Sequence, residues 1–209
     1  MSGALPLLLA VALGYLLGAI PSGLLIGRAL GGVDIRQYGS GRTGATNAMR
    51  SLGARGFALT FVADAGKAIV AVLLARALAG DGSLVAESLA AAAAIVGHNW
   101  SVYIGFGGGR GVACSFGAIL MLFWPGALIG LVVCAALIAA TRLVSLGSIA
   151  GTVVGLIVAL VAVATGAAPP SLAAWAIVTA ALVIGSHRDN IGRLLAGTER
   201  KIGQRVEPT

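Results

Sequence analysis

The sequence predicts an all-α integral membrane protein with about seven transmembrane helices, on the basis of its composition, its apolar runs and its distribution of basic residues. Of the 209 residues, 58% are hydrophobic and only 10% are charged, and the mean hydropathy is +1.00. Soluble domains carry roughly 25% charged residues. A chain of this length has room for about seven spans of about 20 residues with short connections, forming one domain over residues 1–209.

The apolar runs place the individual spans near residues 4–27, 57–79, 84–104, 112–123, 126–141, 143–165 and 171–186. The first run is too long for the apolar region of a secretory signal and has no basic region before it, so we expect it to be retained. The fourth run is too short to cross about 30 Å as a straight helix. We expect its glycine-rich approach to dip into the protein at membrane depth, where protein or water can satisfy the backbone.

Basic residues gather in alternate connections. They are Arg28, Arg36, Arg42, Arg50 and Arg55 after the first span, Arg110 after the third, Arg142 after the fifth, and Arg188, Arg193, Arg200, Lys201 and Arg205 in the tail. The connection after the second span instead carries Asp81. The positive-inside rule then predicts an outside N-terminus and a cytoplasmic C-terminus. Three polar segments, at about 28–56, 105–111 and 187–209, would share the cytoplasmic face and could meet.

The formal net charge of +7 therefore indicates membrane topology and anionic ligands. Nucleic acid is excluded as a partner, because the basic residues do not form one exposed polar domain with interleaved aromatic residues. Cys114 and Cys134 lie in apolar runs without metal-ligand spacing, and neither a two-histidine zinc motif nor a nucleophile elbow occurs. We expect no metal and no Ser-His-Asp hydrolase.

The stretch Gly39–Arg50 is glycine-rich, hydroxyl-rich and basic in an otherwise apolar chain. Its glycines allow tight turns in which several N–H groups converge on one anion. Neutral hydrogen-bonding side chains and two guanidinium groups complete a set that suits phosphate. These side chains are Ser40, Thr43, Thr46, Asn47, Arg42 and Arg50.

Asp64 and Lys67 lie near the cytoplasmic start of the second span, three residues apart and so on one helical face. Ionisable groups within a span usually face a protein interior or a watery cavity. Two interpretations remain open. The residues form an ion pair that fastens helices, or Asp64 holds polar loops while Lys67 faces an anion.

A glycine loop and a polar tail supply the remaining candidates. Gly107–Gly111 surrounds Arg110 with glycines and leads into the next span, whose N-terminus favours an anion. His98, before this loop, is read as a hydrogen-bonded structural histidine. His187 and Asn190 open the tail directly after the last span, three residues apart, and are expected to face the other loops.

These motifs together resemble those of the bacterial acyl-phosphate:glycerol-3-phosphate acyltransferases, the PlsY family, over nearly the whole chain. The family pattern G-S-G-N-x-G-A-T-N-x-x-R matches Gly39–Arg50, with Arg42 in place of asparagine. The pattern D-x-x-K-G matches Asp64–Ala68, with Ala68 in place of glycine. A closing pattern, H-x-E-N-I-x-R-L-x-x-G-x-E, matches His187–Glu199 with aspartate in place of the first glutamate.

The family's third pattern, G-H-x-x-P-x-x-x-x-F-K-G-G-K-G-V-A-T, is recognisable from Gly97 to Cys114 with four substitutions. They are Ser101 for proline, Gly107 and Arg110 for lysines, and Cys114 for threonine. Arg110 keeps the positive charge of the family's lysine, but its planar guanidinium group differs in geometry from a compact ammonium group. Because of these substitutions, it remains an alternative that the chain is a paralogue that uses another acyl donor.

The resemblance implies a multi-pass enzyme of the bacterial plasma membrane with a cytoplasmic active site and no cofactor or metal. It would transfer a fatty acyl group from acyl phosphate to the sn-1 hydroxyl of glycerol 3-phosphate, giving lysophosphatidic acid and phosphate. The implied partners are these two substrates, membrane lipids and an enzyme that produces acyl phosphate. The sequence specifies neither an acyl-chain length nor an oligomeric state.

The resemblance also implies roles for individual residues. Ser40, Arg50, His187 and Asn190 would bind glycerol 3-phosphate, with Asn47 beside them. Lys67, Arg110 and the loop glycines Gly108, Gly109 and Gly111 would hold the acyl phosphate. Asp64, Arg42, Thr46 and His98 would support them. The catalytic groups would be His187, Arg110 and Lys67, and the proton acceptor would be a substrate phosphate, His187 or water.

Two other classes of function remain as alternatives. A small transporter of phosphate or organophosphates would suit broken spans and intramembrane charge, but the halves of the chain show no convincing inverted repeat. A non-catalytic scaffold explains neither the Asp64/Lys67 pair nor three polar segments on one face.

Overall fold

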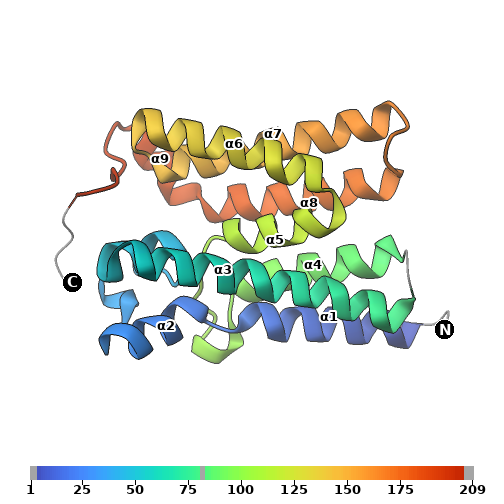
Figure 1. Cartoon of the computed structure of the whole chain (residues 1–209), viewed down its shortest axis with the longest axis horizontal. Coiled ribbons are helices and arrows are strands. Elements are labelled where there is room, and N and C mark those ends of the chain that lie inside the picture. Colours follow the sequence, from blue (N-terminus) through green and yellow to red (C-terminus); the bar gives the residue numbers. More distant parts are fainter. Residues whose placement is uncertain (1–3, 81–82, 205–209) are drawn as a thin grey trace.

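The computed structural model describes residues 4–80 and 83–204. Asp81 and Arg205, which contribute to the predicted orientation, lie outside the described residues. Within the described ranges the regular structure is helical, apart from isolated bridge positions at Tyr38 and at Ser101, which pairs with Gly107. The helices lie side by side along a common long direction (Figure 1).

Each predicted apolar run corresponds to helix. The longer elements are α1 (Ala4–Ala19), α2 (Ser22–Gly31), α3 (Ala45–Ala79), α4 (Leu84–Asn99), α5 (Val112–Leu122), α6 (Trp124–Thr141), α7 (Val144–Ala164), α8 (Pro170–Ser186) and α9 (Arg188–Leu195). Two short 3₁₀ turns, η1 (Ile35–Gln37) and η2 (Val102–Ile104), lie in connections. The first apolar run is divided between α1 and α2, with a break before Ser22.

Four of the described helical stretches are long and apolar enough to cross a membrane: Ala4–Gly31, α3, α6 and α7. The pair α8 and α9, bent by 61°, would be a fifth. The apolar helices α4 and α5 are shorter, with 16 and 11 residues. At 1.5 Å per residue α5 is only about 16 Å long, as its short apolar run predicts. The total of seven spans stays a prediction.

The first polar segment differs from the expected open connection. Helix α2 continues to Gly31, and α3 begins at Ala45, so much of the range 28–56 is helical. The residues after Gly44 include good helix formers such as alanine, methionine and leucine. Gly53 has non-helical backbone angles (φ 69°, ψ −163°) and divides this first part of α3 from the long apolar remainder. Only Gly32–Gly44 is loop and 3₁₀ turn.

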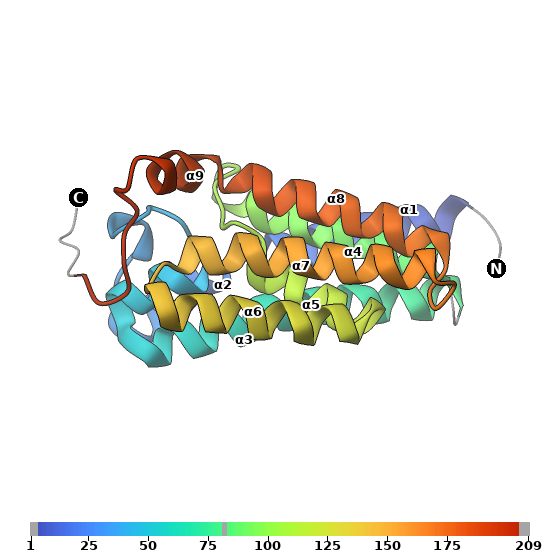
Figure 2. The same ribbon diagram turned by 90° about the horizontal axis from the view of Figure 1, so that it is seen from above.

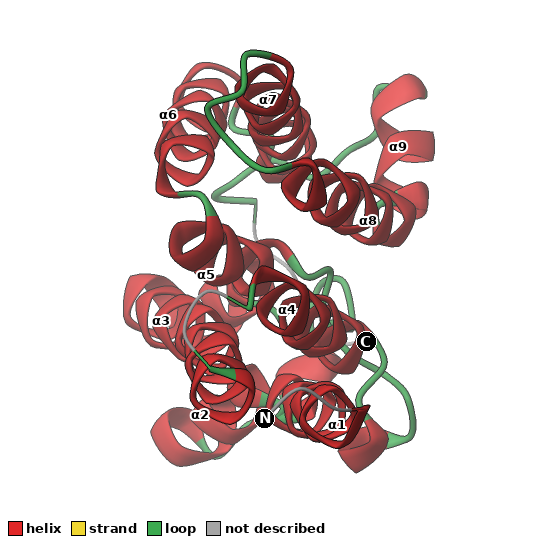
Figure 3. Cartoon of the chain, turned by 90° about the vertical axis from the view of Figure 1, so that its right-hand side faces the viewer, coloured by secondary structure: helices red, strands yellow, loops and turns green. Residues whose placement is uncertain are grey.

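The helices form two groups with α5 between them (Figure 3). In the first group α1 packs on α3 and α4, and in the second α7 packs on α6 and α8. A Cβ atom at Gly18 would overlap the backbone of Ala94, so this glycine allows α1 and α4 to approach closely. Small residues at helix contacts are the usual solution in membranes, where apolar side chains gain little from leaving lipid.

The polar segments gather at one end of the bundle. Helix α2, the start of α3, helix α9 and residues 196–204 lie at the end opposite the start of α1 (Figures 1 and 2). The connection between α4 and α5 reaches the same region, where Gly108 accepts a hydrogen bond from Thr43. The structure therefore brings together the three segments that the charge pattern placed on one face.

Candidate active site

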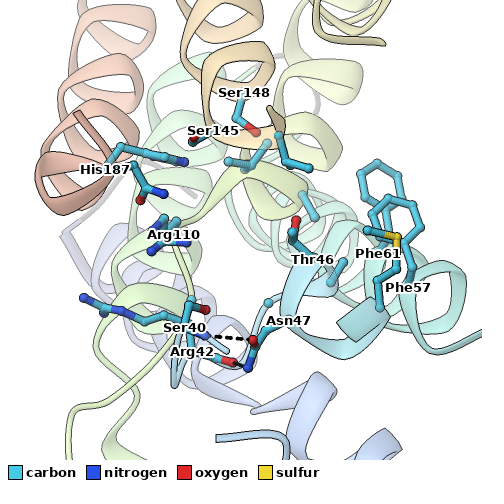
Figure 4. Close-up of a pocket in the computed structure, with 18 of the residues that line it drawn as sticks. Ser40, Arg42, Thr46, Asn47, Phe57, Phe61, Arg110, Ser145, Ser148 and His187 are labelled. Atoms are coloured by element: carbon cyan, nitrogen blue, oxygen red, sulfur yellow. Dashed lines mark hydrogen bonds between the residues drawn. The ribbon is translucent and has the colours of Figure 1, made fainter. Parts of the chain in front are cut away.

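A cavity of about 400 Å³ lies between these segments (Figure 4). The predicted site residues line it, with the exceptions of Lys67 and Gly108. Those in the wall are Ser40, Arg42, Thr46, Asn47, Arg50, Asp64, His98, Gly109, Arg110, Gly111, His187 and Asn190. The cavity also contacts apolar residues of α3 and α6, among them Phe57, Phe61 and Leu131.

Asn47 organises the first wall. Its Oδ1 accepts a hydrogen bond from the backbone N–H of Ser40 at 3.1 Å. Its Nδ2 donates to the carbonyl oxygens of Ile35 (2.7 Å) and Arg42 (2.9 Å). The amide thus uses both kinds of hydrogen-bonding group to fold the loop over the start of α3. Asn47 thereby holds Ser40 and Arg42 at the cavity.

The glycine loop forms the second wall. The N–H of Gly109 donates to the carbonyl of His98 at 3.0 Å, and Gly111 adopts a left-handed conformation (φ 79°) directly before α5. A Cβ at Gly109 would overlap the His98 ring, so the close approach of loop to ring requires glycine. The loop is tied to its neighbours through Thr43 N–H, which donates to Gly108 O at 3.4 Å.

Arg110 stands in this loop, and Figure 4 shows its guanidinium among Ser40, Arg42 and His187. Its backbone carbonyl accepts a hydrogen bond from Ser186 Oγ at 2.9 Å, which fixes the loop to the end of α8. Burial, together with the positive charges of Arg42 and Arg193, lowers the pKa of Arg110 to about 10. The side chain is still charged at neutral pH, and a bound anion would stabilise it.

Lys67 lies behind the cavity wall in a buried network. Its ammonium is 2.8 Å from Asp64 Oδ1, donates to Ile20 O at 2.8 Å and is 3.0 Å from His98 Nδ1. An ammonium donates and cannot accept, so its contact with His98 is a hydrogen bond when Nδ1 is unprotonated, whereas a protonated Nδ1 would face Asp64 Oδ1 at 3.4 Å. The network fastens α3 to α4 and supports the ring against which Gly109 packs.

The third wall comes from the end of α8 and the tail. His187 Nδ1 is 2.8 Å from the carbonyl oxygen of Val183. A carbonyl only accepts, so Nδ1 carries the proton and Nε2 of the neutral ring has a free lone pair. Asn190 donates through Nδ2 to Glu199 at 2.6 Å, and its buried Oδ1 has no partner among the described residues.

Glu199 was not among the predicted site residues, although it is the last residue of the closing family pattern, His187–Glu199. Its carboxylate accepts hydrogen bonds from Asn190, from Ser145 Oγ at 3.0 Å and from Arg193 Nε at 2.8 Å. Partial burial by itself would raise the pKa of Glu199, but these three hydrogen bonds lower it below its ordinary value. The ionised carboxylate joins α7, α9 and the tail at the cavity.

The tail then crosses the mouth of the cavity. Arg200 donates to the carbonyl oxygen of Gly39 at 2.9 Å, and Ile202 exchanges two hydrogen bonds with Arg142 at the start of the α6–α7 connection. Arg200 and Ile202 both line the cavity. Arg200 and Ile202 were not among the predicted site residues, because no local sequence pattern shows that their partners lie 161 and 60 positions away.

The balance of charge favours an anion. Arg42, Arg50, Arg110 and Arg200 line the cavity, whereas its two carboxylates are already engaged, Asp64 with Lys67 and Glu199 with Arg193. Among the described residues, no ion pair engages Arg42, Arg50 or Arg110. Fold and site together define a helical membrane protein with an arginine-lined cavity that adjoins apolar helices.

Comparison with known proteins assigns the family. The family model described as glycerol-3-phosphate acyltransferase matches residues 8–197. The chain belongs to this family of integral membrane enzymes of phospholipid biosynthesis. Among similar proteins, the glycerol-3-phosphate acyltransferase of Synechococcus sp. (strain CC9902) is 44% identical over 198 residues, covering 95% of this chain and 96% of the relative. Glycerol-3-phosphate acyltransferase 1 of Deinococcus radiodurans is 44% identical over 201 residues, covering 95% and 97%.

Two crystal structures of PlsY (YgiH), an integral membrane glycerol 3-phosphate acyltransferase, are similar in fold. The glycerol 3-phosphate form matches with a TM-score of 0.84 and 36% identity, covering 94% of this chain and 96% of that one. The lysophosphatidic acid form matches with a TM-score of 0.83 and 35% identity, covering 94% and 95%. The family expected from the sequence motifs is thereby confirmed.

Proposed function

We propose that this acyltransferase takes its acyl group from a fatty acyl phosphate and transfers it to the sn-1 hydroxyl of glycerol 3-phosphate. The products are lysophosphatidic acid and inorganic phosphate. The observation that carries the proposal is the convergence of Arg42, Arg50 and Arg110 on one cavity that also contains the free Nε2 of His187. Two phosphate-bearing substrates need this much positive charge, and PlsY crystal structures with glycerol 3-phosphate and with lysophosphatidic acid support the choice of acceptor and product.

Each substrate has a wall suited to it. Glycerol 3-phosphate binds Ser40 and Arg50 through its phosphate, while its hydroxyl groups face His187 and Asn190, whose buried Oδ1 can accept a hydrogen bond. The acyl phosphate lies at the glycine loop, where Arg110 and the N-terminus of α5 attract its charge. Lys67 acts from behind this wall, by holding His98.

The reaction is a direct transfer. The sn-1 oxygen forms a bond to the acyl carbonyl carbon, and the tetrahedral intermediate then releases inorganic phosphate by breaking the acyl–phosphate bond. Arg110 and the loop N–H groups stabilise the oxyanion. The hydroxyl proton passes to His187 Nε2 and from there to the departing phosphate. Because acyl phosphate is already activated, the protein mainly orients the two substrates and neutralises them.

The orientation follows from the basic connections and is part of the same proposal. The enzyme lies in the bacterial plasma membrane, with seven spans, the N-terminus outside and the cavity open to the cytoplasm. Glycerol 3-phosphate reaches the cavity from the cytoplasm, and the acyl chain reaches it from the bilayer.

Purified protein incubated with labelled glycerol 3-phosphate and palmitoyl phosphate is expected to form lysophosphatidic acid and phosphate in equal amounts. The same assay with palmitoyl coenzyme A or a carrier-protein thioester is expected to give none. No product from folded protein with any donor would overturn the proposed activity. Product from a thioester alone would overturn the donor, and uptake of glycerol 3-phosphate into proteoliposomes without a donor would favour a transporter.

Replacing Asn47 by alanine is expected to lower kcat/KM for glycerol 3-phosphate by about 10- to 100-fold, because three hydrogen bonds of about 1 kcal/mol each then no longer hold Ser40 and Arg42. Initial rates at varied glycerol 3-phosphate measure the effect. Ser51→Ala is the matched control, since Ser51 Oγ contacts only helix carbonyls at 3.4 Å. Equal kinetics of the two variants would contradict the role of Asn47.

A further inference from the structure

A second cavity of about 110 Å³ adjoins the first. The two share wall residues from α3, α5, α6 and α7, namely Phe61, Val112, Leu131, Cys134 and Ser148. The rest of the second wall comes from α5, α6, α7 and α8. We call this second cavity the deep pocket. It continues from the charged site into the apolar interior of the protein.

We propose that the deep pocket receives the distal part of the acyl chain, and that Gly155 and Trp175 at its inner end limit the length of chain the enzyme accepts. This inference rests on the proposed function, because it requires an acyl donor held at the glycine loop. It adds to that function a preferred chain length and the residues that set it.

The depth of the deep pocket indicates the length of the acyl chain that it can hold. Trp175 lies 12 residues before His187 on α8, a distance of about 18 Å along the helix at 1.5 Å per residue. On α7, Gly155 lies ten residues after Ser145, which is at the charged cavity, a distance of about 15 Å. An extended chain advances about 1.2 Å per bond, since the three bonds of a residue span about 3.5 Å. A chain of about 16 carbons would therefore end near Trp175.

Gly155 leaves usable space in the wall. A Cβ at Gly130 would lie 2.7 Å from the carbonyl oxygen of Gly151, and one at Gly151 would lie 2.6 Å from that of Gly130, so these two glycines are committed to the contact of α6 with α7. A Cβ at Gly155 would instead lie 3.4 Å from Gly126 O and 3.6 Å from Ile119 Cδ1, both in the pocket wall. Alanine therefore fits at 155 and takes up room in the pocket.

Trp175 closes the inner end of the deep pocket by packing. The residue is only 4% exposed, and its Nε1 has no hydrogen-bond partner among the described residues. Packing alone holds the indole ring, so a smaller apolar side chain at this position leaves no acceptor unsatisfied and enlarges the pocket. Substitutions at 155 and 175 thus change the pocket in opposite directions.

The test is kcat/KM for a series of saturated acyl phosphates from roughly 12 to roughly 20 carbons, expressed for each protein as the ratio of each donor to the shortest one. This ratio does not depend on the fraction of protein that is folded. The parent enzyme is expected to favour about 16 carbons. Gly155→Ala should lower the ratio for the longest accepted donor about fourfold, the effect of one buried methylene, and Trp175→Leu should raise it for longer donors.

Gly185→Ala is the control, because this glycine is on α8 and a Cβ there would meet nothing within 4 Å. Its chain-length profile should equal that of the parent. Active Gly155→Ala and Trp175→Leu enzymes with the parent profile would overturn this inference and leave the proposed function intact. Absence of transfer from every donor by the folded parent enzyme would overturn both this inference and the proposed function.

Discussion

Replacing Asp64 by alanine is expected to destabilise the protein by about 3–5 kcal/mol, because it leaves the ammonium of Lys67 buried without its counter-ion. The two side chains are 2.8 Å apart and only 1% and 6% exposed. The remaining partners of Lys67 are the Ile20 carbonyl and the His98 ring, and neither carries a negative charge. Thermal unfolding of the purified protein in detergent, and its abundance in membranes, would show the loss.

Asp34→Ala provides the comparison, since Asp34 pairs with Arg36 at 2.6 Å but the two side chains are 21% and 38% exposed. An exposed pair contributes at most about 1 kcal/mol. Replacing both buried partners together, by Asp64→Leu with Lys67→Met, should recover stability while activity stays low, because His98 and the glycine loop lose their support. A single Asp64→Ala variant as stable as Asp34→Ala would show that the buried network does not hold α3 to α4.

Replacing Arg110 by alanine is expected to lower kcat/KM about 10²- to 10³-fold without unfolding the protein, since removing one donor that stabilises a developing oxyanion costs about 3–4 kcal/mol. Arg110→Lys keeps the charge and should recover part of this loss, although a single ammonium cannot reproduce two parallel hydrogen bonds. Steady-state kinetics with both substrates varied would separate weaker binding from slower transfer.

Arg188→Ala is the matched control, because Arg188 is near the same end of the bundle but its side chain is 84% exposed, with Asp189 at 3.6 Å. It should retain the parent rate. If Arg110→Ala were as active as Arg188→Ala, Arg110 would have no part in stabilising the transition state.

The sequence predicts the helical architecture and most of the cavity wall. Long apolar runs define the helices because lipid requires internally satisfied backbone, and the alternation of basic connections predicts that distant polar segments meet. Ser40, Arg110 and His187 come from three such segments and do line one cavity. The start of α3 was harder to predict, because glycines and hydroxyls around Thr46 resemble a loop while the residues after Gly44 form helix.

What the sequence could not specify depends on tertiary contacts. The spacing of Asp64 and Lys67 shows that they share a helical face, but not which groups that face meets. The carbonyl of Ile20 becomes available to Lys67 because the chain breaks between α1 and α2, and α4 supplies His98. The partners of Glu199 lie on α7 and α9, and no local pattern reveals them.

The hydrogen bond from Arg200 to the carbonyl of Gly39 joins residues 161 positions apart. It has a consequence for the order of biosynthesis. A growing chain can insert every apolar helix into the membrane and still lack Glu199, Arg200 and Ile202 at the mouth of its cavity. The wall of the cavity is therefore completed only after the ribosome has passed residue 202, so a nascent chain already embedded in the bilayer still has an incomplete cavity.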